Sequence, residues 1–181
     1  IIGISIPQRF YAQWKFIECL LGLQIPIIYE AGSLVDQNRN KLVERAKEFD
    51  YLLMIDSDMV FKKEDIEKLE NYIKDGLDIV SGHHMRGSGE FPSIFKETSG
   101  DYEQQLEIGE GLIEVDAVGA AFLMISKKTM QTIKDPFSFI SVNGFTQGED
   151  ISFCHKARAE GFKVWVDTSI KIGHIRHVIF Y

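Results

Sequence analysis

The chain has 181 residues, of which 45% are hydrophobic and 26% charged, and its formal net charge is −7. This length and composition fit one compact globular domain and exclude a disordered chain. The negative charge argues against a general nucleic-acid binder, whose affinity depends on a basic surface. We therefore expect no nucleic-acid partner.

Membrane insertion is also not expected. No segment reaches the roughly 18 consecutive apolar residues that a transmembrane helix needs, and the start, IIGISIP, lacks a basic leader. The first residue is not Met, which leaves room for a preceding segment. Cys19 and Cys154 are too few for a disulfide framework. They fit a reducing compartment, and we expect a cytoplasmic location.

In the first ninety residues, predicted strands alternate with predicted helices. The strands are 1–6, 25–29, 51–55 and 77–81, and the helices are 10–21, 32–49 and 63–74. Pro7 halts the first strand and Gly76 ends the third helix. Such alternation is typical of a parallel sheet in a Rossmann-like α/β sandwich.

The pattern changes in the second half. Three predicted strands, 91–96, 112–117 and 121–126, follow one another without helices, so we expect added antiparallel strands and loops. Residues 135–147 are loop-like but contain Phe137, Phe139, Ile140 and Phe145, which suggests a lid. A helix from 148 to about 160 and strands at 162–167 and 170–175 complete the chain.

The stretch YLLMIDSDMVF, residues 51–61, indicates a ligand site. Its apolar run ends in Asp56 and Asp58, as expected for a buried strand emerging at a sheet edge. Ligands of open α/β sheets bind at the carboxyl ends of strands, and paired carboxylates there suit a hard divalent cation carrying phosphate. The alternative is that the Asp-Ser-Asp run only makes a turn and caps the next helix.

Three features in order resemble the GT-A glycosyltransferases, particularly the family 2-like group. They are the strand ending in Asp56-Ser57-Asp58, the Gly-Glu-Asp at 148–150 that opens a helix, and the late Gly-His at 173–174. The resemblance implies an α/β fold, a Rossmann-like GT-A sandwich with a mostly parallel central sheet. It implies one catalytic domain, 1–181, in which residues 1–90 bind the nucleotide sugar and residues 91–181 bind the acceptor.

The resemblance also implies an activity and a metal. A metal-dependent hexosyltransferase would move sugar from a nucleotide-diphosphate donor to a glycan or other hydroxyl acceptor, with inversion. A Mn²⁺ or Mg²⁺ ion would neutralise charge on the leaving diphosphate. Asp58 and His174 would hold the ion, and Asp56 would reach it through water or contact the ribose. The alternative for His174 is a hydrogen-bonded histidine at a strand end, with His177 as a substitute ligand.

Asp150 is the candidate general base, which would accept the proton of the acceptor hydroxyl as it attacks. Glu149 would position acceptor hydroxyls. The alternative is that both carboxylates only cap the helix and interact with its dipole.

The remaining candidates would contact the donor. Arg39 and Arg86 offer paired donors to phosphate, although each could instead form a surface salt bridge. Pro7, Gln8 and Gly32, at predicted carboxyl ends of the first two strands, would lie near the base and ribose, and Arg9 and Ser57 are further candidates for binding the donor. Of the adjacent His83 and His84, at most one can face the ligand. Glu30 is the nearest candidate for a contact to the base.

Three other functions compete. Asp56-Ser57-Asp58-Met59-Val60 fits a haloacid-dehalogenase-like phosphatase with Asp56 as nucleophile, but Glu149-Asp150 begins a helix instead of ending a strand. A nucleotidyltransferase would need a Gly-rich basic loop near Pro7, which is absent. A catalytically inactive nucleotide-sugar-binding domain is the third alternative, against which the presence of Asp58, Asp150 and His174 counts.

Overall fold

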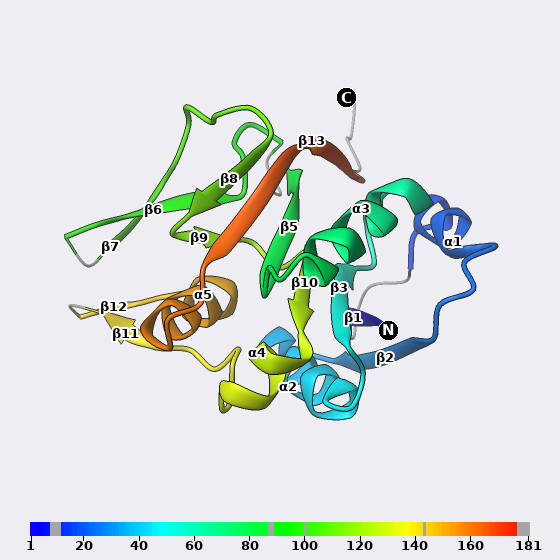
Figure 1. Ribbon diagram of the computed structural model, residues 1–181, viewed down its shortest axis with the longest axis horizontal. Coiled ribbons are helices and arrows are strands. Elements are labelled where there is room, and N and C mark those ends of the chain that lie inside the picture. Colours follow the sequence, from blue (N-terminus) through cyan, green and yellow to red (C-terminus); the bar gives the residue numbers. More distant parts are fainter. Residues whose placement is uncertain (8–11, 87–88, 100, 143, 177–181) are drawn as a thin grey trace, which may run out of the picture.

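A mixed β-sheet runs through the centre of the protein (Figure 1). The computed structural model describes residues 1–7, 12–86, 89–99, 101–142 and 144–176. In this part of the chain the main sheet has the order β2-β1-β3-β10-β5-β13-β4, with β8 paired to β13. Its strands are β1 (Ile2–Pro7), β2 (Ile27–Gly32), β3 (Tyr51–Asp56), β4 (Met59–Val60), β5 (Ile79–His84), β8 (Leu112–Val115), β10 (Phe122–Ser126) and β13 (Val164–His174).

The strand directions confirm the predicted α/β class. β1, β2 and β3 pair in parallel, as do β5 and β13. β10 lies antiparallel between β3 and β5. The carboxyl ends of β1, β2 and β3 therefore meet at one edge, where Pro7 pairs with Gly32 and Ser5 with Asp56.

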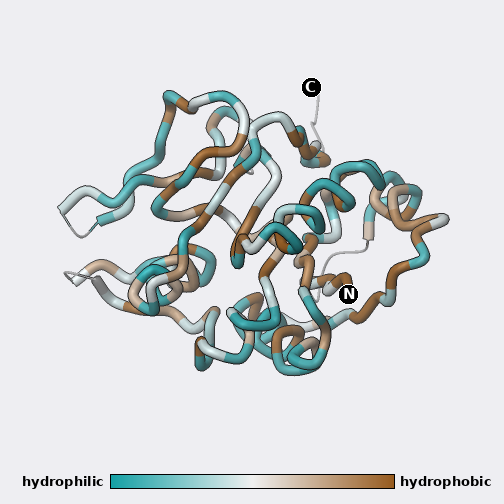
Figure 2. Tube along the Cα trace, viewed as in Figure 1, coloured by the Kyte–Doolittle hydropathy of each residue, from teal (hydrophilic) through white to brown (hydrophobic). Residues whose placement is uncertain are grey.

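Helices cover both faces of the sheet. One core cluster joins the sheet to α2 (Val35–Ala46), α4 (Lys127–Thr132) and α5 (Glu149–Ala159). The other joins it to α1 (Trp14–Leu20) and α3 (Lys63–Lys74). Apolar residues follow the central strands while polar residues mark the outer sides of the helices (Figure 2). The burial of β3 on both faces explains its unbroken apolar sequence.

Some boundaries differ from the prediction. The third helix matches its predicted range, whereas β2 lies two to three residues later than expected, because it continues to pair with β1 as far as Gly32. The predicted strands 162–167 and 170–175 are one strand, β13, interrupted by an irregularity between Asp167 and Lys171. Helix α4 was not predicted; Ser126 caps it by accepting a hydrogen bond from the Thr129 N–H.

The second half adds the expected antiparallel pairs. A small sheet contains β6 (Ile94–Thr98), β7 (Asp101–Gln104) and β9 (Ala117–Val118), and a hairpin contains β11 (Ser141–Val142) and β12 (Phe145–Thr146). In the predicted lid loop, Phe137 is fully buried and stacks on Phe153 at 4.7 Å between ring centroids. Phe139 and Phe145 are exposed. Part of this loop is therefore core, and a lid role for the exposed part stays a prediction.

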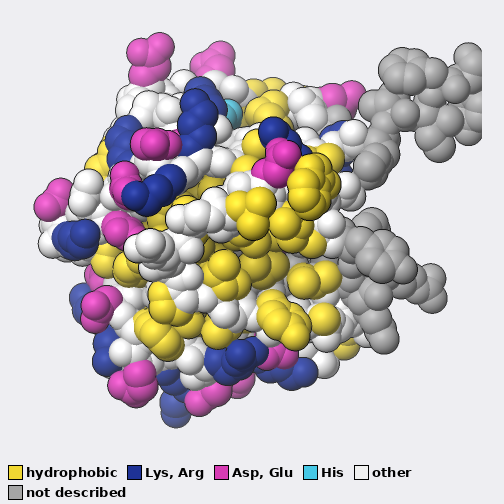
Figure 3. All heavy atoms as spheres, turned by 90° about the vertical axis from the view of Figure 1, so that its right-hand side faces the viewer, with side chains coloured by type: hydrophobic (Ala, Val, Ile, Leu, Met, Phe, Trp, Pro, Cys, Tyr) yellow, Lys and Arg dark blue, Asp and Glu magenta, His cyan; other side chains and the backbone are white. Residues whose placement is uncertain are grey.

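One face carries apolar side chains at its surface (Figure 3). Four large apolar side chains on or next to α1 and β2 are exposed. Trp14 begins α1 and Leu21 follows its last residue, while Ile27 and Tyr29 belong to β2. β2 forms one edge of the main sheet, so no further strand of the described chain pairs with its outer side. No described helix is long and apolar enough to span a membrane.

Asp167 fixes the irregular part of β13. Its carboxylate accepts hydrogen bonds from the Ser169 N–H and hydroxyl, at 2.8 and 2.7 Å, and from the Tyr72 hydroxyl at 2.8 Å. Lys68 Nζ lies 2.5 Å from the same carboxylate. Burial opposes the charge of Asp167, but Lys68 and the hydroxyl donors outweigh it and lower the pKa to about 2. β13 is thereby tied to α3 before it reaches His174.

We expect Asp167→Asn to lower the free energy of unfolding by about 2 kcal/mol at neutral pH, from the size of the pKa shift. A lowered pKa stabilises the fold above the ordinary aspartate pKa, and this contribution disappears as the pH falls from about 4 towards 2. Urea denaturation of both proteins at pH 7 and at pH 3 measures it. Glu103→Gln, at an exposed position on β7, is the control. An equal stability difference at both pH values would contradict this role.

Candidate functional site

A cavity of about 260 Å³ opens beside the end of β3 and the start of α5. Six of the predicted site residues line it: Arg39, Asp56, Arg86, Glu149, Asp150 and His174. They come from α2, β3, the end of β5, α5 and β13, which are far apart in the sequence. The sheet topology therefore brings the three predicted motifs to one place.

His174 and Asp58 are in contact. The backbone fixes both, because Met59 pairs with His174 in the β4–β13 ladder and the Ile175 N–H donates to the Asp58 carbonyl at 2.8 Å. His174 Nε2 lies 3.1 Å from Asp58 Oδ2. The hydrogen bond to Asp58 raises the pKa of His174. Burial opposes ionisation of Asp58, but the contact with His174 and the charge of Arg176 together lower its pKa.

The donor set of this pair fits a divalent cation. His174 Nδ1 lies 3.0 Å from the Met85 carbonyl oxygen, so both ring nitrogens face oxygen acceptors. A protonated imidazole, which the raised pKa of His174 favours, would donate to both oxygens, whereas a neutral imidazole has one N–H and can satisfy only one of them. With Nδ1–H on the carbonyl, the Nε2 lone pair faces the Asp58 carboxylate, an arrangement that a cation between them would satisfy. Arg176 Nη2 also lies 2.5 Å from Nε2, so a cation bound at Nε2 would displace this guanidinium.

No third histidine, cysteine or carboxylate joins the pair to form a cluster within the described residues. A bound cation would therefore need further oxygens from elsewhere, as in sites that hold a metal together with substrate phosphates. Asp56 is otherwise engaged, since both of its oxygens accept from Arg39 Nη2, at 3.0 and 3.2 Å.

Arg39 links the two acidic motifs. Its side chain is buried, with 4% exposed, and Nη1 lies 2.5 Å from Glu149 Oε1. The guanidinium also lies over the Phe137 ring, 5.9 Å from its centroid. The Arg39 guanidinium thus holds the end of β3 and the first turn of α5 together. Arg39 is not a surface salt bridge, and its predicted contact with the diphosphate stays a prediction.

Removing the Arg39 guanidinium leaves the carboxylates of Asp56 and Glu149 facing each other. We expect Arg39→Met to lower the free energy of unfolding by roughly 3 kcal/mol, the scale for breaking a buried ion pair. Arg45→Met is the matched control on the same helix, because Arg45 pairs with Glu30 at the surface and such pairs contribute at most about 1 kcal/mol. Urea denaturation compares them. Adding Glu149→Gln to Arg39→Met should restore part of the loss; equal effects of the two arginine variants would contradict the role.

The two carboxylates of α5 differ in their partners. Burial raises the pKa of Glu149, and the nearby Arg39 charge opposes the shift. Asp150 also lines the cavity, and its Oδ1 accepts from the Ile151 N–H at 2.8 Å. Among the described residues, no lysine or arginine forms a salt bridge with Asp150. Asp150 is therefore the α5 carboxylate that can accept a proton without first breaking an ion pair.

The predicted donor-binding residues do not all lie at the cavity. Arg86 is exposed at the cavity, with its guanidinium 5.7 Å from the Phe95 ring centroid. Pro7 and Gly32 lie at carboxyl ends of strands as expected. Gly32 and the buried Ser57 are not among the described residues that line this cavity. Gln8, Arg9 and His177 lie outside the described residues.

Sequence reasoning did not choose between His83 and His84. The structure places His84 on the cavity wall and His83 in a separate pocket. Burial lowers the pKa of His84 to about 4, so the ring is neutral at pH 7. Gly119 lies against it: a Cβ there would approach His84 Nε2 at 3.1 Å and Ser93 Oγ at 2.2 Å. A side chain larger than that of glycine does not fit at position 119 in this cavity wall.

Residues 23–132, more than half of the chain, match glycosyl transferase family 2. The chain belongs to this family. Family 2 glycosyltransferases in general use nucleotide-sugar donors, and GT-A enzymes commonly bind a divalent metal. The matched range contains the Asp56-Ser57-Asp58 strand end and Arg39 but ends before α5 and His174.

Three solved structures share the fold of this family 2 glycosyltransferase. A197 from STIV has a TM-score of 0.75 and 22% identity, over 97% of this chain and 86% of that one. GalNAc-T7, crystallised with UDP, GalNAc and Mn²⁺, has a TM-score of 0.62 and 11% identity, over 98% of this chain and 44% of that one. The UTP-bound UGPase from Acinetobacter baumannii has a TM-score of 0.51 and 9% identity, over 86% and 57%. No curated protein matches the chain.

Proposed function

We propose that this family 2 glycosyltransferase transfers a sugar from a nucleotide-diphosphate donor to an acceptor hydroxyl, with a divalent cation and with inversion at the anomeric carbon. The observation that carries the proposal is the contact between His174 Nε2 and the Asp58 carboxylate, in a histidine whose Nδ1 faces the Met85 carbonyl. GalNAc-T7, which shares the fold, was crystallised with UDP and Mn²⁺. The donor set of one carboxylate and one imidazole favours Mn²⁺ over Mg²⁺.

Asp58 and His174 would hold the cation. Once bound, Mn²⁺ or Mg²⁺ supplies positive charge against the departing diphosphate. The Nδ1–H of His174 donates to the Met85 carbonyl, which orients the ring and leaves Nε2 as the ligand atom. Arg86, exposed at the cavity, adds a guanidinium that phosphate oxygens can reach.

Asp150 would take the proton of the acceptor hydroxyl at its carboxylate. Arg39 holds Glu149 and the end of β3 in place, and thereby orients the first turn of α5. A base opposite the leaving diphosphate corresponds to inversion, because the hydroxyl attacks from that side. Asp56 and Glu149 are both in contact with the buried guanidinium, which supports a positioning role for them.

The two halves of the chain divide the substrates in this proposal. Residues 1–90 supply β1, β2, β3 and Asp58 for the nucleotide sugar, and residues 91–181 supply Asp150 for the acceptor, which is a glycan or another hydroxyl compound. The phosphatase alternative does not agree with family membership, and both Asp56 oxygens accept hydrogen bonds from Arg39 rather than standing free as a nucleophile.

Release of nucleoside diphosphate from a panel of nucleotide sugars, with and without Mn²⁺, tests the proposal. We expect release from at least one donor, and its loss when the metal is chelated. Donor binding without release in the presence of candidate acceptors would favour an inactive binding domain. Release of inorganic phosphate from simple phosphomonoesters would favour the phosphatase.

A further inference from the structure

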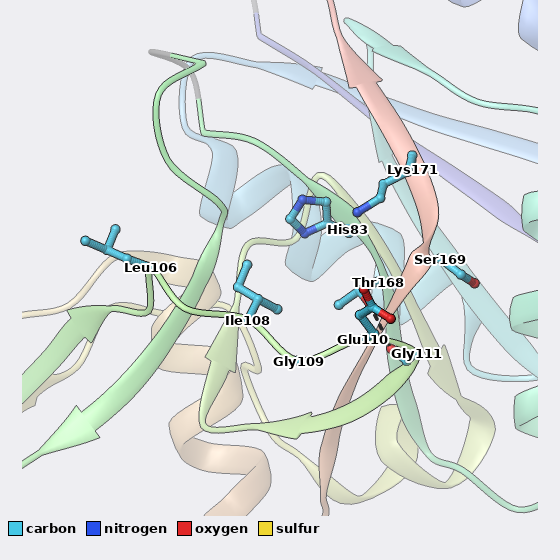
Figure 4. A pocket seen from close by; sticks show the side chains of 9 residues that line it. All are labelled: His83, Leu106, Ile108, Gly109, Glu110, Gly111, Thr168, Ser169 and Lys171. Carbon is cyan, nitrogen blue, oxygen red and sulfur yellow. Dashed lines mark hydrogen bonds between the residues drawn. The ribbon is translucent and has the colours of Figure 1, made fainter.

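A second pocket, of about 540 Å³, shares no lining residue with the candidate active site. Its volume falls within the roughly 300–1,000 Å³ range of small-molecule sites. His83 and Lys171 enter it from β5 and β13, where they are register partners. Figure 4 shows both side chains reaching into the space between these strands and the loop that carries Ile108 to Gly111.

The charged groups of this pocket balance each other. Lys171 contributes a cation and Glu110, on the opposite loop, an anion. Burial, together with the charge of Lys171, lowers the pKa of His83, so its ring is neutral at pH 7. A phosphate in this pocket would face the Glu110 carboxylate as well as Lys171. Repulsion from Glu110 disfavours such an anion. The pocket therefore suits a ligand without net charge.

The hydrogen-bonding groups need both donors and acceptors from the ligand. Lys171 can only donate, and an ionised Glu110 can only accept. The Thr168 hydroxyl donates to the Gly111 carbonyl at 3.1 Å, which leaves its oxygen lone pairs for a ligand (Figure 4). The His83 ring also lines the pocket, but its Nδ1 is buried out of reach of solvent and does not count among these groups. A hydroxyl group donates and accepts at one atom, so neighbouring hydroxyls can satisfy a wall of this kind.

The remaining wall is apolar. Leu106 and Ile108 line it, and Leu106 is 63% exposed. Sugar rings combine hydroxyls at their edges with C–H groups on their faces, which matches a polar wall opposite an aliphatic one. We propose that this pocket binds a neutral sugar unit, outside the candidate donor site and independently of turnover there.

Titration of the isotope-labelled protein with glucose, galactose, mannose and N-acetylglucosamine, each alone, tests the proposal. The backbone amide signals of Gly109 and Gly111 report on the pocket. We expect at least one sugar to shift them saturably, in the absence of nucleotide and metal. No shift with any of the four sugars, or a shift with inorganic phosphate alone, would overturn the proposal.

Three variants locate the binding. Lys171→Met and Glu110→Gln should each weaken it by about tenfold, the scale of a lost charged hydrogen bond. Leu106→Ser removes an exposed apolar group and keeps the test independent of the charged residues. Lys96→Met and Glu103→Gln, at exposed register partners on β6 and β7, are the controls. Wild-type affinity in all three pocket variants, or equal losses in the controls, would contradict the assignment. Because no turnover is measured, failure here leaves the proposed transferase activity to its own test.

Discussion

Asp58→Asn will remove the metal-dependent part of donor binding. An amide lacks the charge that balances a divalent cation, and the contact with His174 Nε2 then joins two neutral groups. We expect the affinity for nucleoside diphosphate in the presence of Mn²⁺ to fall by about 10²-fold or more, the upper range seen when the surroundings of a metal site are altered. Affinity without metal should stay the same. Calorimetric titration of UDP, GDP, CDP and ADP, with and without Mn²⁺, measures both.

His174→Gln should reproduce this loss, since Asp58 and His174 come together from β13 and the turn after β3. His155→Gln is the matched control, because His155 Nδ1 contacts the Tyr102 hydroxyl away from the cavity. If Asp58→Asn keeps both its donor affinity and the wild-type dependence on Mn²⁺, Asp58 is not a metal ligand.

The second large effect concerns the general base. Asp150→Asn should lower the rate of turnover by about 10²-fold or more, the scale of a lost general base. Donor affinity should change little, because Asp150 is not part of the Asp58–His174 pair. The initial rate of nucleoside diphosphate release at saturating donor and acceptor measures the effect.

Glu64→Gln controls for the loss of a carboxylate from the first turn of a helix, because Glu64 is an exposed residue at that position in α3. Unchanged turnover in Asp150→Asn would remove the residue from this role. The anomeric configuration of the product is an independent check, since a product with retained configuration needs no base opposite the leaving group.

The sequence predicted the parts of the fold that depend on local patterns. α3 has helical spacing of Ile66 and Leu69 and is found over the predicted residues. β3 is an apolar run that ends at Asp56, because it is buried between two helical layers. The order of β-α units was enough to predict a mainly parallel first half. The short α4 was missed, since its six residues form less than two turns and depend on the Ser126 cap.

The arrangement of the site depends on long-range contacts that spacing does not reveal. Glu149 and Arg39 are 110 residues apart, and only the fold shows that Arg39 is paired with two carboxylates. The continuation of β13 through its irregularity to His174 depends on Asp167, Lys68 and Tyr72. The second pocket has no motif at all, because its residues come from three separate segments.

The central claim is that Asp58 and His174 hold one cation. Anomalous diffraction from crystals soaked with Mn²⁺ and the best-binding nucleoside diphosphate tests it most directly. We predict one manganese peak within coordination distance of both the Asp58 carboxylate and His174 Nε2, with diphosphate oxygens completing its ligands. A manganese ion bound to the nucleotide but away from His174, or at another part of the sheet, would contradict the account.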